Sequence, residues 1–280
     1  MCRILFLKWT NTKKAINYIN AFYKAWFNDP HLEIWMKDLG LNNMKNQHNH
    51  GWWYLLVTEN SINTYLNWQA FFDDKLWFNN LKKQIKNIKW KFLLMAELRL
   101  TDEWYISALN SHPFFFSSEN WYEWWFFYNW LLNREELSKM ECIKYQNFQK
   151  KNGTTIIWHC ISKKLENWEN IKEALLWAKK AIKSWYNLMC FLHNNKWEYK
   201  AYLNAYSKEK LLEKPDYKEY IKLIKKEEPD LFFAWSNAIS VYKKGNYKTM
   251  KNWEFLEFDI DFINESYFSA KECWIEKIEL

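Results

Sequence analysis

Glycine is nearly absent from this chain. It supplies 4 of 280 residues, whereas it makes up about 7% of an average protein. Proline is equally scarce, with 4 residues, and no stretch rich in Ser, Gly or Pro divides the chain. A flexible linker between domains is therefore not indicated, and residues 1–280 are predicted to form a single domain with a substantial core.

Long apolar runs are also missing. No run reaches the roughly 18 residues that a transmembrane helix needs. Near the start of the chain, Arg3 and Lys8 bracket only the four apolar residues Ile4–Leu7, which are too few for the apolar core of a signal peptide. We therefore expect a cytoplasmic protein with no membrane partner.

Cysteine is sparse and follows no pattern. The five cysteines are an odd number, and no two of them form a Cys-x-x-Cys pair. This argues against a disulfide framework or a structural zinc site, and for a reducing cytoplasm. His48 and His50 form a His-x-His motif, but no set of Cys or carboxylate residues follows at ligand spacing, so we expect a polar loop and no metal.

Clusters of basic residues are lacking as well. The net charge of +7 comes from 40 Lys and Arg against 33 Asp and Glu, and the lysines are spread along the chain. Spread lysines are typical of solvated faces, so no nucleic-acid partner is expected. One alternative stays open: Trp121–Phe127, taken literally, could form an exposed aromatic face that binds membranes or single-stranded nucleic acid.

Tryptophan is as common as glycine is rare, with 21 residues. The dipeptide Asn-Trp occurs five times, whereas Asn-Gly is the dipeptide that favours tight turns, because both of its residues tolerate a positive φ. Tryptophan, with a Cβ atom and a large ring, does not share that tolerance. The five dipeptides are Asn67-Trp68, Asn120-Trp121, Asn129-Trp130, Asn167-Trp168 and Asn252-Trp253.

We therefore hypothesise that most of these tryptophans are glycines that were decoded wrongly. The UGA codon is a stop in the common code, Trp in one variant code and Gly in another, so the wrong variant would convert glycines to tryptophans. The composition, rich in Lys, Asn, Ile, Tyr and Phe, suits an AT-rich genome, in which such recoding occurs. The alternative is a genuinely Trp-rich protein, and UGG codons at Trp68, Trp121, Trp130 and Trp253 would establish it.

The apolar pattern predicts helices and strands in groups, without strict alternation of the two. Helical spacing of apolar residues predicts helices over Thr12–Ala25 with Asn11 or Thr12 as the cap, Phe78–Ile88, Glu169–Lys183 and Asp216–Lys226. Strands are predicted over Cys2–Leu7, Phe92–Leu98, Phe114–Phe116, Phe126–Tyr128, Met189–His193, Glu198–Asn204, Leu231–Ala234 and Glu254–Ile260. Grouped elements favour an α+β fold with antiparallel sheets.

Three short motifs can carry chemistry. Cys2 directly follows Met1, and removal of Met1 would leave a thiol and a free α-amine on one residue. An α-amine, with an ordinary pKa of about 7.7–8.0, can serve as the general base for its own nucleophile. Arg99 ends a predicted buried strand, where a guanidinium is costly unless it meets a substrate carboxylate or a structural acid. Asn129-Trp130, read as Asn-Gly, can form an oxyanion hole from an amide and a backbone N–H.

Together these motifs resemble the class II glutamine amidotransferases, the N-terminal-cysteine branch of the Ntn-hydrolase superfamily. The opening Met1-Cys2-Arg3 is similar to that of stand-alone bacterial members. The family has Arg, then Gly five residues on, then Asn-Thr-His-Pro-Phe, and Arg99, Trp104 and Asn110–Phe114 match it if Trp104 is Gly. The family's His-Asn-Gly, Asp-Gly-Trp-Gly, Ala-Ser and Gly-Glu motifs are matched by Tyr128-Asn129-Trp130, His50-Gly51-Trp52-Trp53, Phe233–Ser236 and Asn252-Trp253-Glu254.

The resemblance implies a fold and a site. The implied fold is α+β, a four-layer αββα Ntn-hydrolase sandwich with two mainly antiparallel sheets. Cys2 would attack the side-chain amide of glutamine, while Asn129 and the backbone N–H of residue 130 would stabilise the oxyanion. The implied substrate-binding residues are Arg99, Trp104, Asn110 and His112. No cofactor is implied, and because the chain shows no synthetase or sugar-isomerase domain, an ammonia acceptor would belong to a separate subunit.

The chain departs from the family in two places. Tyr128 replaces the usual His of the oxyanion motif. The family's Thr-Asp-Ser-Glu segment, whose Asp binds the substrate α-amine, corresponds to Asn152–Ile157, which contains no acid; Glu141 and Glu166 are the nearest acids in the sequence. The substrate could therefore be glutamine or another γ-glutamyl amide, and a catalytically silent Ntn-fold binding protein is the alternative.

Overall fold

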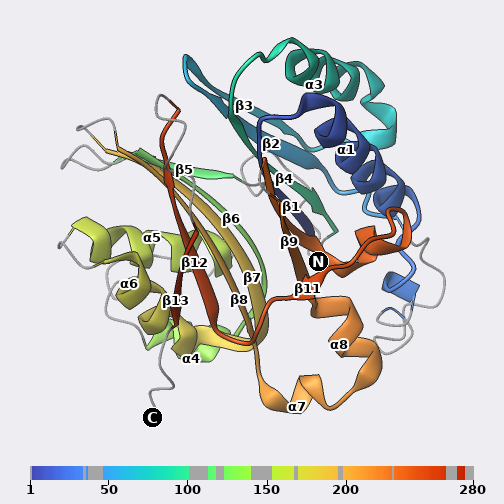
Figure 1. Cartoon of the computed structure of the whole chain (residues 1–280). Helices are drawn as coiled ribbons and strands as arrows, with labels where there is room; N and C mark the ends of the chain where they lie inside the picture. Colours follow the sequence, from blue (N-terminus) through green and yellow to red (C-terminus); the bar gives the residue numbers. More distant parts are fainter. Residues whose placement is uncertain are drawn as a thin grey trace. The chain divides into compact units, whose positions relative to one another are not determined.

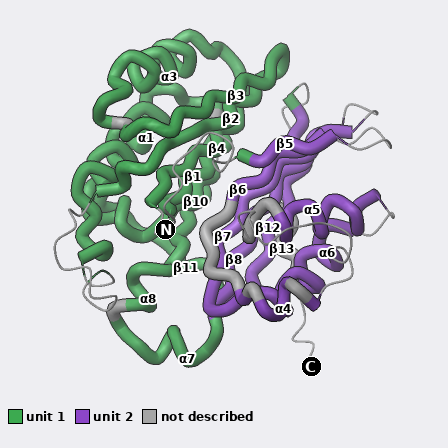
Figure 2. Tube along the Cα trace, turned by 180° about the vertical axis from the view of Figure 1, so that it is seen from behind, with its two compact units in different colours: residues 1–113, 208–251, 262–265 green, residues 114–207, 252–261, 266–280 purple. Residues whose placement is uncertain are grey.

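The computed structural model of the chain comprises two compact units, each built around one antiparallel sheet (Figures 1 and 2). The structure describes residues 2–33, 36, 47–100, 113–117, 123–139, 153–166, 170–194, 198–228, 230–262 and 270–274. Unit 1 is Met1–Pro113, Lys208–Lys251 and Phe262–Glu265, and unit 2 is Phe114–Ser207, Asn252–Asp261 and Ser266–Leu280. The single domain predicted for residues 1–280 stays a prediction.

Unit 1 contains a seven-stranded sheet in the order β11-β9-β10-β1-β4-β2-β3. Its strands are β1 (Cys2–Trp9), β2 (Trp52–Thr58), β3 (Ser61–Asn67), β4 (Phe92–Arg99), β9 (Leu223–Glu228), β10 (Leu231–Ser236) and β11 (Lys248–Thr249). Its helices are α1 (Thr12–Phe27), α3 (Lys75–Asn87), α7 (Glu209–Leu212) and α8 (Pro215–Ile221), with the 3₁₀ turns η1 (Phe71–Asp73) and η6 (Asn237–Val241).

Helix α1 shows how the sequence positions this sheet. Its N-cap is Asn11, whose side chain accepts a hydrogen bond from the backbone N–H of Lys14 at 3.1 Å, as N-cap residues do. Tyr18 and Phe22 recur at helical spacing and are buried against one face of the sheet. The helix ends where Asn28 turns extended, just ahead of Pro30. Burial of this apolar stripe fixes which face of β1 the helices cover.

Because side chains alternate along β1, its residues divide between the helix-covered face and the opposite face of the sheet. Leu5 and Leu7 lie in the cluster with α1 and α3, so Cys2, Ile4 and Phe6 lie on the opposite face, because successive strand residues point to opposite sides. The face that carries Cys2 is the one the helices of unit 1 leave uncovered.

Unit 2 contains a six-stranded sheet in the order β13-β12-β8-β7-β6-β5. Its strands are β5 (Phe114–Ser117), β6 (Glu123–Leu132), β7 (Ile182–His193), β8 (Tyr199–Ser207), β12 (Glu254–Ile260) and β13 (Ala270–Trp274). Its helices are α4 (Arg134–Ser138), α5 (Gly153–Glu166) and α6 (Ile171–Ala178), followed by the 3₁₀ turn η5 (Lys179–Ala181). Helices α5 and α6 pack with strands β6 and β7 in one apolar cluster.

The aromatic segment of β6 belongs to the interior of unit 2. Trp124 and Phe126 pack on Trp158 of α5, with ring centroids 4.0 Å and 4.4 Å apart. Trp124, Trp125, Phe126 and Phe127 are all buried. The reading of this stretch as an exposed aromatic face is therefore wrong for residues 124–127, because alternate side chains on both faces of β6 are covered; Trp121 and Tyr122 lie outside the described residues.

The predicted fold class is confirmed. All described strand pairs in both sheets are antiparallel and helices accompany each sheet, which gives the predicted α+β fold with two antiparallel sheets. The predicted strands and helix α1 are present. However, β7 begins at Ile182 and not at Met189, β6 extends beyond Phe126–Tyr128 at both ends, and β2 and β3 were not predicted. Two helices were predicted too long: Leu223–Glu228 is strand β9, and Ile182 already begins β7.

The cysteines correct one further expectation. Cys2 and Cys190 are buried free thiols, whereas Cys160 of α5 is disulfide-bonded. The odd number and scattered spacing argued against a disulfide framework, but spacing along the chain does not report which thiols the fold brings together.

Candidate active site

Cys2 and Arg99 lie directly opposite each other on adjacent strands of unit 1. They are register partners in the antiparallel β1–β4 ladder, and opposed residues of such a ladder point to the same face with Cα atoms about 4.5–5.5 Å apart. Both side chains are buried, at 7% and 4% exposure. A nucleophile and a cation that are far apart in sequence thus share the face of the sheet that the helices of unit 1 do not cover.

The end of β4 is held in place by the segment that precedes β2. Arg99 N–H donates to the Gly51 carbonyl at 3.0 Å, and His50 N–H donates to the Arg99 carbonyl at 3.1 Å. Gly51 has a φ of +114°, and a Cβ there would lie 2.8 Å from the Asn67 carbonyl oxygen. One of the few remaining glycines therefore occupies a position that only glycine fits, beside the arginine of the candidate site.

The Cys2 thiol sits in an environment that disfavours the thiolate. Burial, the charge of Glu97 and a hydrogen bond to Glu97 raise the pKa of Cys2 to about 12, while the chain's amino terminus and Arg99 act in the opposite direction. A thiol attacks as the thiolate. These surroundings therefore hold Cys2 protonated, and its attack requires a base that removes the thiol proton.

Glu97 is a component of this site that the sequence motifs did not single out. It lies on β4 opposite Ile4 of β1 and Trp53 of β2, and it is fully buried. The indole N–H of Trp53 donates to Glu97 Oε2 at 3.1 Å. Its place two residues before Arg99 on a buried strand was the available signal, because residues i and i+2 of a strand share a face.

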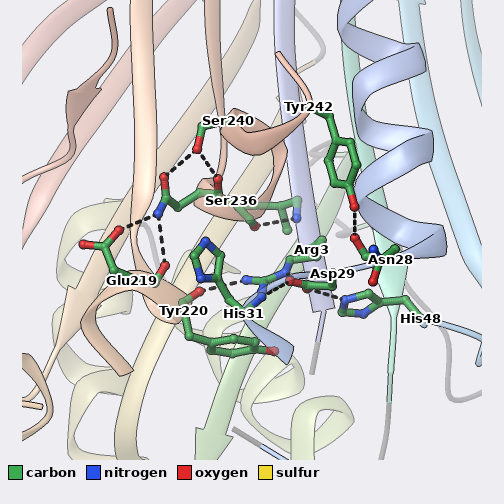
Figure 3. Close-up of polar contacts among 12 residues, drawn as sticks. Arg3, Asn28, Asp29, His31, His48, Glu219, Tyr220, Ser236, Ser240 and Tyr242 are labelled. Carbon is green, nitrogen blue, oxygen red and sulfur yellow. Dashed lines mark hydrogen bonds and ion pairs between the residues drawn. The ribbon is translucent and has the colours of Figure 1, made fainter. Parts of the chain in front are cut away.

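On the helix-covered side of β1, Arg3 anchors the start of the strand in a buried charge network (Figure 3). Arg3 Nε lies 2.5 Å from Asp29 Oδ2, and its Nη1 donates to the Tyr220 carbonyl at 2.8 Å. His48 Nε2 lies 2.8 Å from the same Asp29 oxygen, and His31 N–H donates to Oδ1 at 2.9 Å. The network joins β1 to the segment after α1, the segment before β2 and the end of α8.

The charges in this network are mutually dependent. Burial alone would raise the pKa of Asp29, but Arg3 and His48 hold it well below its usual range. Burial lowers the pKa of His48, opposed by Asp29, so neutral His48 donates Nε2–H to the carboxylate. The His-x-His motif was expected to be a polar loop. His48 instead has a buried structural role.

A second network fixes the other edge of β1. The Ile4 N–H donates to Ser236 Oγ at 3.0 Å, and Asn237 Nδ2 donates to Glu219 Oε2 at 2.7 Å (Figure 3). Ser240 Oγ donates to the Asn237 carbonyl at 2.6 Å. The first bond connects Ile4, two residues after Cys2, to Ser236 of β10, and the bond from Asn237 connects the end of β10 to α8. The strand that carries the nucleophile is thus held by its neighbours.

The predicted oxyanion residues lie in unit 2. Asn129 and Trp130 belong to β6 and face Asn187 and Tyr186 across the β6–β7 ladder, whose register shifts between Trp130 and Leu132. A bulge of this kind locally redirects the strand and is common near functional sites. For Asn129 and Trp130 the structure describes the backbone register, and their side chains lie outside the described part of the chain.

Three predicted substrate-binding residues, Trp104, Asn110 and His112, lie outside the described residues. Asn152, of the segment that lacks the expected acid, also lies outside them, whereas Gly153–Ile157 begin helix α5. Of the two nearest acids, Glu141 is outside the described residues, and Glu166 pairs with Lys163 at 2.8 Å on the surface of α5. Among the described residues, no three His, Cys, Asp or Glu side chains form a group that could hold a metal ion.

The turn at Asn252-Trp253 supports the glycine hypothesis at one position. Trp253 has a φ of 67°, and no other non-glycine residue of the described chain has a positive φ. The Asn252 side chain accepts from Ser207 N–H at 2.7 Å and donates to its carbonyl at 2.8 Å, and so fixes the turn. A bulky residue in the left-handed region is a genuine outlier, whereas glycine adopts it freely.

No helix within the described ranges is both long and apolar enough to cross a bilayer. No protein-family model matches the sequence. No curated protein matches it either.

Solved structures do match. The structure of the allosteric regulatory enzyme of purine biosynthesis superimposes with a TM-score of 0.60 over 96% of this chain and 48% of that chain, at 12% identity. This chain thus spans about half the length of that enzyme. A glutamine aminotransferase class-II domain protein from Silicibacter pomeroyi gives a TM-score of 0.41 at 10% identity over 80% of this chain and 98% of that one.

A predicted glutamine amidotransferase from Pseudomonas aeruginosa PA01 also gives a TM-score of 0.41, at 7% identity, over 91% of this chain and 95% of that one. At these identities the likeness concerns the fold. The superposition on the purine enzyme covers nearly the whole chain and shows that the two antiparallel sheets with their helices have the fold of the matching half of that enzyme. Cys2 lies on the first strand of this fold.

Proposed function

We propose that the chain is an amidohydrolase of the class II glutamine amidotransferase type, which hydrolyses glutamine or a related γ-glutamyl amide. The observation that carries the proposal is the pairing of Cys2 with Arg99 on one buried sheet face. A thiol beside a fixed guanidinium suits a substrate with an amide at one end and a carboxylate at the other. The motifs that resemble the family support the same reading.

The reaction follows from these groups. After removal of Met1, the Cys2 α-amine takes the thiol proton, and Sγ forms a bond to the amide carbon. The resemblance to the family assigns the stabilisation of the oxyanion to Asn129 and the N–H of residue 130. The C–N bond then breaks, the shuttled proton goes to the leaving nitrogen, and ammonia departs. Water hydrolyses the thioester, which releases the carboxylate product and restores the thiol.

A catalytically silent binding protein is the second candidate. The high pKa of the buried Cys2 thiol favours it, because a thiol held protonated is a poor nucleophile. In that case the sheet face would bind the same ligand without turnover. An acceptor for ammonia, if the enzyme transfers it, would sit on a separate subunit.

The test uses the full chain with Trp53→Gly, Trp104→Gly, Trp130→Gly and Trp253→Gly, which we call the four-glycine protein. We expect mass spectrometry to show that Met1 is removed, and L-glutamine to yield ammonia and glutamate. The control is Cys2→Ala in the same protein, which should abolish product. Equal product from the Ala variant would reject Cys2 as the nucleophile, and binding of glutamine without product would favour the silent protein.

A further inference from the structure

Helices α1 and α3 lie side by side on one face of the sheet of unit 1 (Figure 1). Tyr23 of α1 stacks on Phe78 of α3 with ring centroids 5.0 Å apart, and Phe27 at the end of α1 contacts Phe72, just before α3, at 6.1 Å. The two helices are therefore antiparallel, and we call them together the helix layer. It contains three lysines from α1 and four from α3, and neither helix contains Asp or Glu.

The outward face of α1 consists of lysine, asparagine and one phenylalanine. Positions 13, 17, 20, 24 and 27 recur at intervals of four and three, so they share the side of the helix opposite its buried stripe. The residues at these positions are Lys13, Asn17, Asn20, Lys24 and Phe27, and each is exposed or half-buried. This face therefore carries two positive charges and no negative one.

Helix α3 repeats the pattern. Its outward row, at the same intervals and opposite its buried residues, is Leu76, Asn80, Lys83 and Asn87. Leu76 is 69% exposed. The exposed acid nearest to this row in the sequence is Asp73, in the turn before α3. The two helices thus present matching outward faces, each with lysine, asparagine and one large apolar side chain.

The positive charges of the helix layer are not balanced within it. Lys14 pairs with Glu228 and Asp230, at 3.2 Å and 3.8 Å, where α1 begins. On α3, burial and then the charge of Lys86 lower the pKa of Lys82, so the lysines of this helix repel each other. An anionic surface laid against the layer would supply the missing counter-charge.

We propose that the helix layer binds the surface of a lipid bilayer that contains anionic phospholipids. At 1.5 Å per residue the two helices are about 24 and 20 Å long, so a flat surface laid on them brings every outward lysine within a Debye length of about 10 Å. The layer covers the face of the sheet opposite Cys2. The candidate site is therefore not part of the contact, and this inference does not rest on the proposed reaction.

Two apolar side chains distinguish a bilayer from other polyanions. Phe27 and Leu76 are 53% and 69% exposed, and the antiparallel helices place both at the same end of the layer. A leucine cannot stack on a nucleobase as aromatic side chains do, whereas both residues gain free energy between lipid headgroups and acyl chains. Two side chains at one end are also too few for the apolar core of a stable protein interface.

The proposal departs from the expectation, based on the sequence, that the chain has no membrane partner. That expectation rested on lysines that are spread along the sequence, but helical spacing gathers them on one surface. The proposal is also independent of how the tryptophans are decoded, because Phe27, Leu76 and the lysines keep their identity in either case.

Vesicle sedimentation with the four-glycine protein tests the proposal. Vesicles of equal parts phosphatidylcholine and phosphatidylglycerol should bind the protein at least about 10-fold more tightly than vesicles of phosphatidylcholine alone, and added salt should weaken the binding. Replacing Lys13, Lys24 and Lys83 together by Gln should weaken it by about 100-fold, since one lysine near an anionic surface contributes about five-fold.

The matched control replaces three exposed lysines on and beside α7 and α8 by Gln, namely Lys208, Lys210 and Lys218. It removes the same net charge and should bind as the parent does. Phe27→Ser with Leu76→Ser should weaken binding by about 10-fold, because less apolar surface is buried, and should keep the preference for anionic vesicles. Circular dichroism checks that each variant is folded.

Three results would overturn the proposal. The first is equal binding of the parent to both kinds of vesicle. The second is an equal loss in the two triple-lysine variants, which would trace binding to net charge alone. The third is binding of a single-stranded oligonucleotide, lost in the Lys13, Lys24 and Lys83 variant, by a protein that does not bind anionic vesicles; this would assign the layer to nucleic acid. None of these outcomes depends on whether the protein hydrolyses glutamine.

Discussion

At the scale of single residues, the tryptophans separate by their surroundings. Trp52 is buried in the helix-covered core and its indole N–H donates to Asp74 at 2.9 Å, as a buried tryptophan normally requires. Trp235 is also buried, but its indole N–H has no acceptor among the described residues, which costs about 1–3 kcal/mol. Trp253 carries a positive φ. The environment of Trp52 thus suits an indole, whereas those of Trp235 and Trp253 suit it less well.

Trp253 gives the sharpest test of a single position. Its ring stacks on Tyr206 with a centroid distance of 4.0 Å and lies under the Lys179 ammonium, so removing the ring loses contacts whatever replaces it. We therefore compare Trp253→Gly with Trp253→Ala, which lose the same ring. Because the left-handed region costs an L-residue about 1–2 kcal/mol, the Gly variant should be more stable by about 1 kcal/mol in urea unfolding. An Ala variant of equal or greater stability would contradict this.

At the scale of elements, the sequence predicted the strands well where apolar residues were continuous or alternating. β1, β4, β10 and β12 were recognised because their side chains are buried. Leu223–Lys226 was predicted as the end of the helix Asp216–Lys226, but it belongs to strand β9, which pairs with both β10 and β11. Cross-strand pairing of this kind is a tertiary effect that local propensity does not contain.

The candidate site was predicted in part from the sequence. Cys2 and Arg99 were found through motifs, and the fold places them opposite each other. Glu97 was missed because it belongs to none of the motifs, although its position two residues before Arg99 on a buried strand places it on the same face. The Arg3–Asp29–His48 network was missed for a related reason: its members are 26 and 19 residues apart, and only the packing of α1 against the sheet brings them together.

That network predicts an acid sensitivity of unit 1. The folded pKa of Asp29 lies below its unfolded value of about 3.9, so its contribution to the free energy of unfolding is present above that pH and is lost as the pH falls. The lowered pKa of His48 acts in the same direction below about pH 6.5, because the unfolded histidine binds a proton that the folded one excludes. Stability should therefore fall as the pH drops from about 6.5.

The variant Asp29→Asn tests this account. It leaves Arg3 buried without its counter-charge, so it should lower the free energy of unfolding by about 3–5 kcal/mol at pH 7, and the difference from the parent should narrow below about pH 5. The matched control is Glu228→Gln, which breaks the ion pairs of Glu228 with Lys14 (3.2 Å) and Lys226 near the protein surface and should cost less than about 1 kcal/mol. Denaturant titrations at several pH values measure both, and equal costs for the two variants would reject the network.

At the scale of the whole molecule, the glycine hypothesis and the site hypothesis meet in two adjacent residues. Trp52 and Trp53 are both buried, at 1% and 0% exposure, yet they lie on opposite faces of β2. Trp52 packs in the apolar cluster with Trp26 and Tyr65. Trp53 lies on the face that carries Glu97 and Cys2. If position 53 is glycine, the space that its ring fills lies beside Glu97, on the face that also carries Cys2 and Arg99.

This contrast predicts different outcomes for the same substitution at neighbouring positions. Trp52→Gly would leave an apolar void in the core, and truncation of a buried Trp costs about 3–5 kcal/mol or more. Trp53→Gly would open a space beside a carboxylate, a thiol and a guanidinium, which water can occupy. In the four-glycine protein, we therefore expect a soluble yield and a Tm at or above those of the all-Trp chain, whereas the all-Trp chain with Trp52→Gly should lose both.

The codons of the gene provide an independent test of the difference between Trp52 and Trp53. Because recoding acts codon by codon, the hypothesis expects UGA at residues 53, 104, 130 and 253, and UGG at residue 52, whose indole is buried and bonded to Asp74. A genuinely Trp-rich protein would carry UGG at all five. It would also lose as much stability from Trp53→Gly as from Trp52→Gly, since both rings would then be parts of one packed core. UGG at residue 53, together with equal losses in urea unfolding, would thus make Trp53 a native core residue and reject the glycine hypothesis at that position.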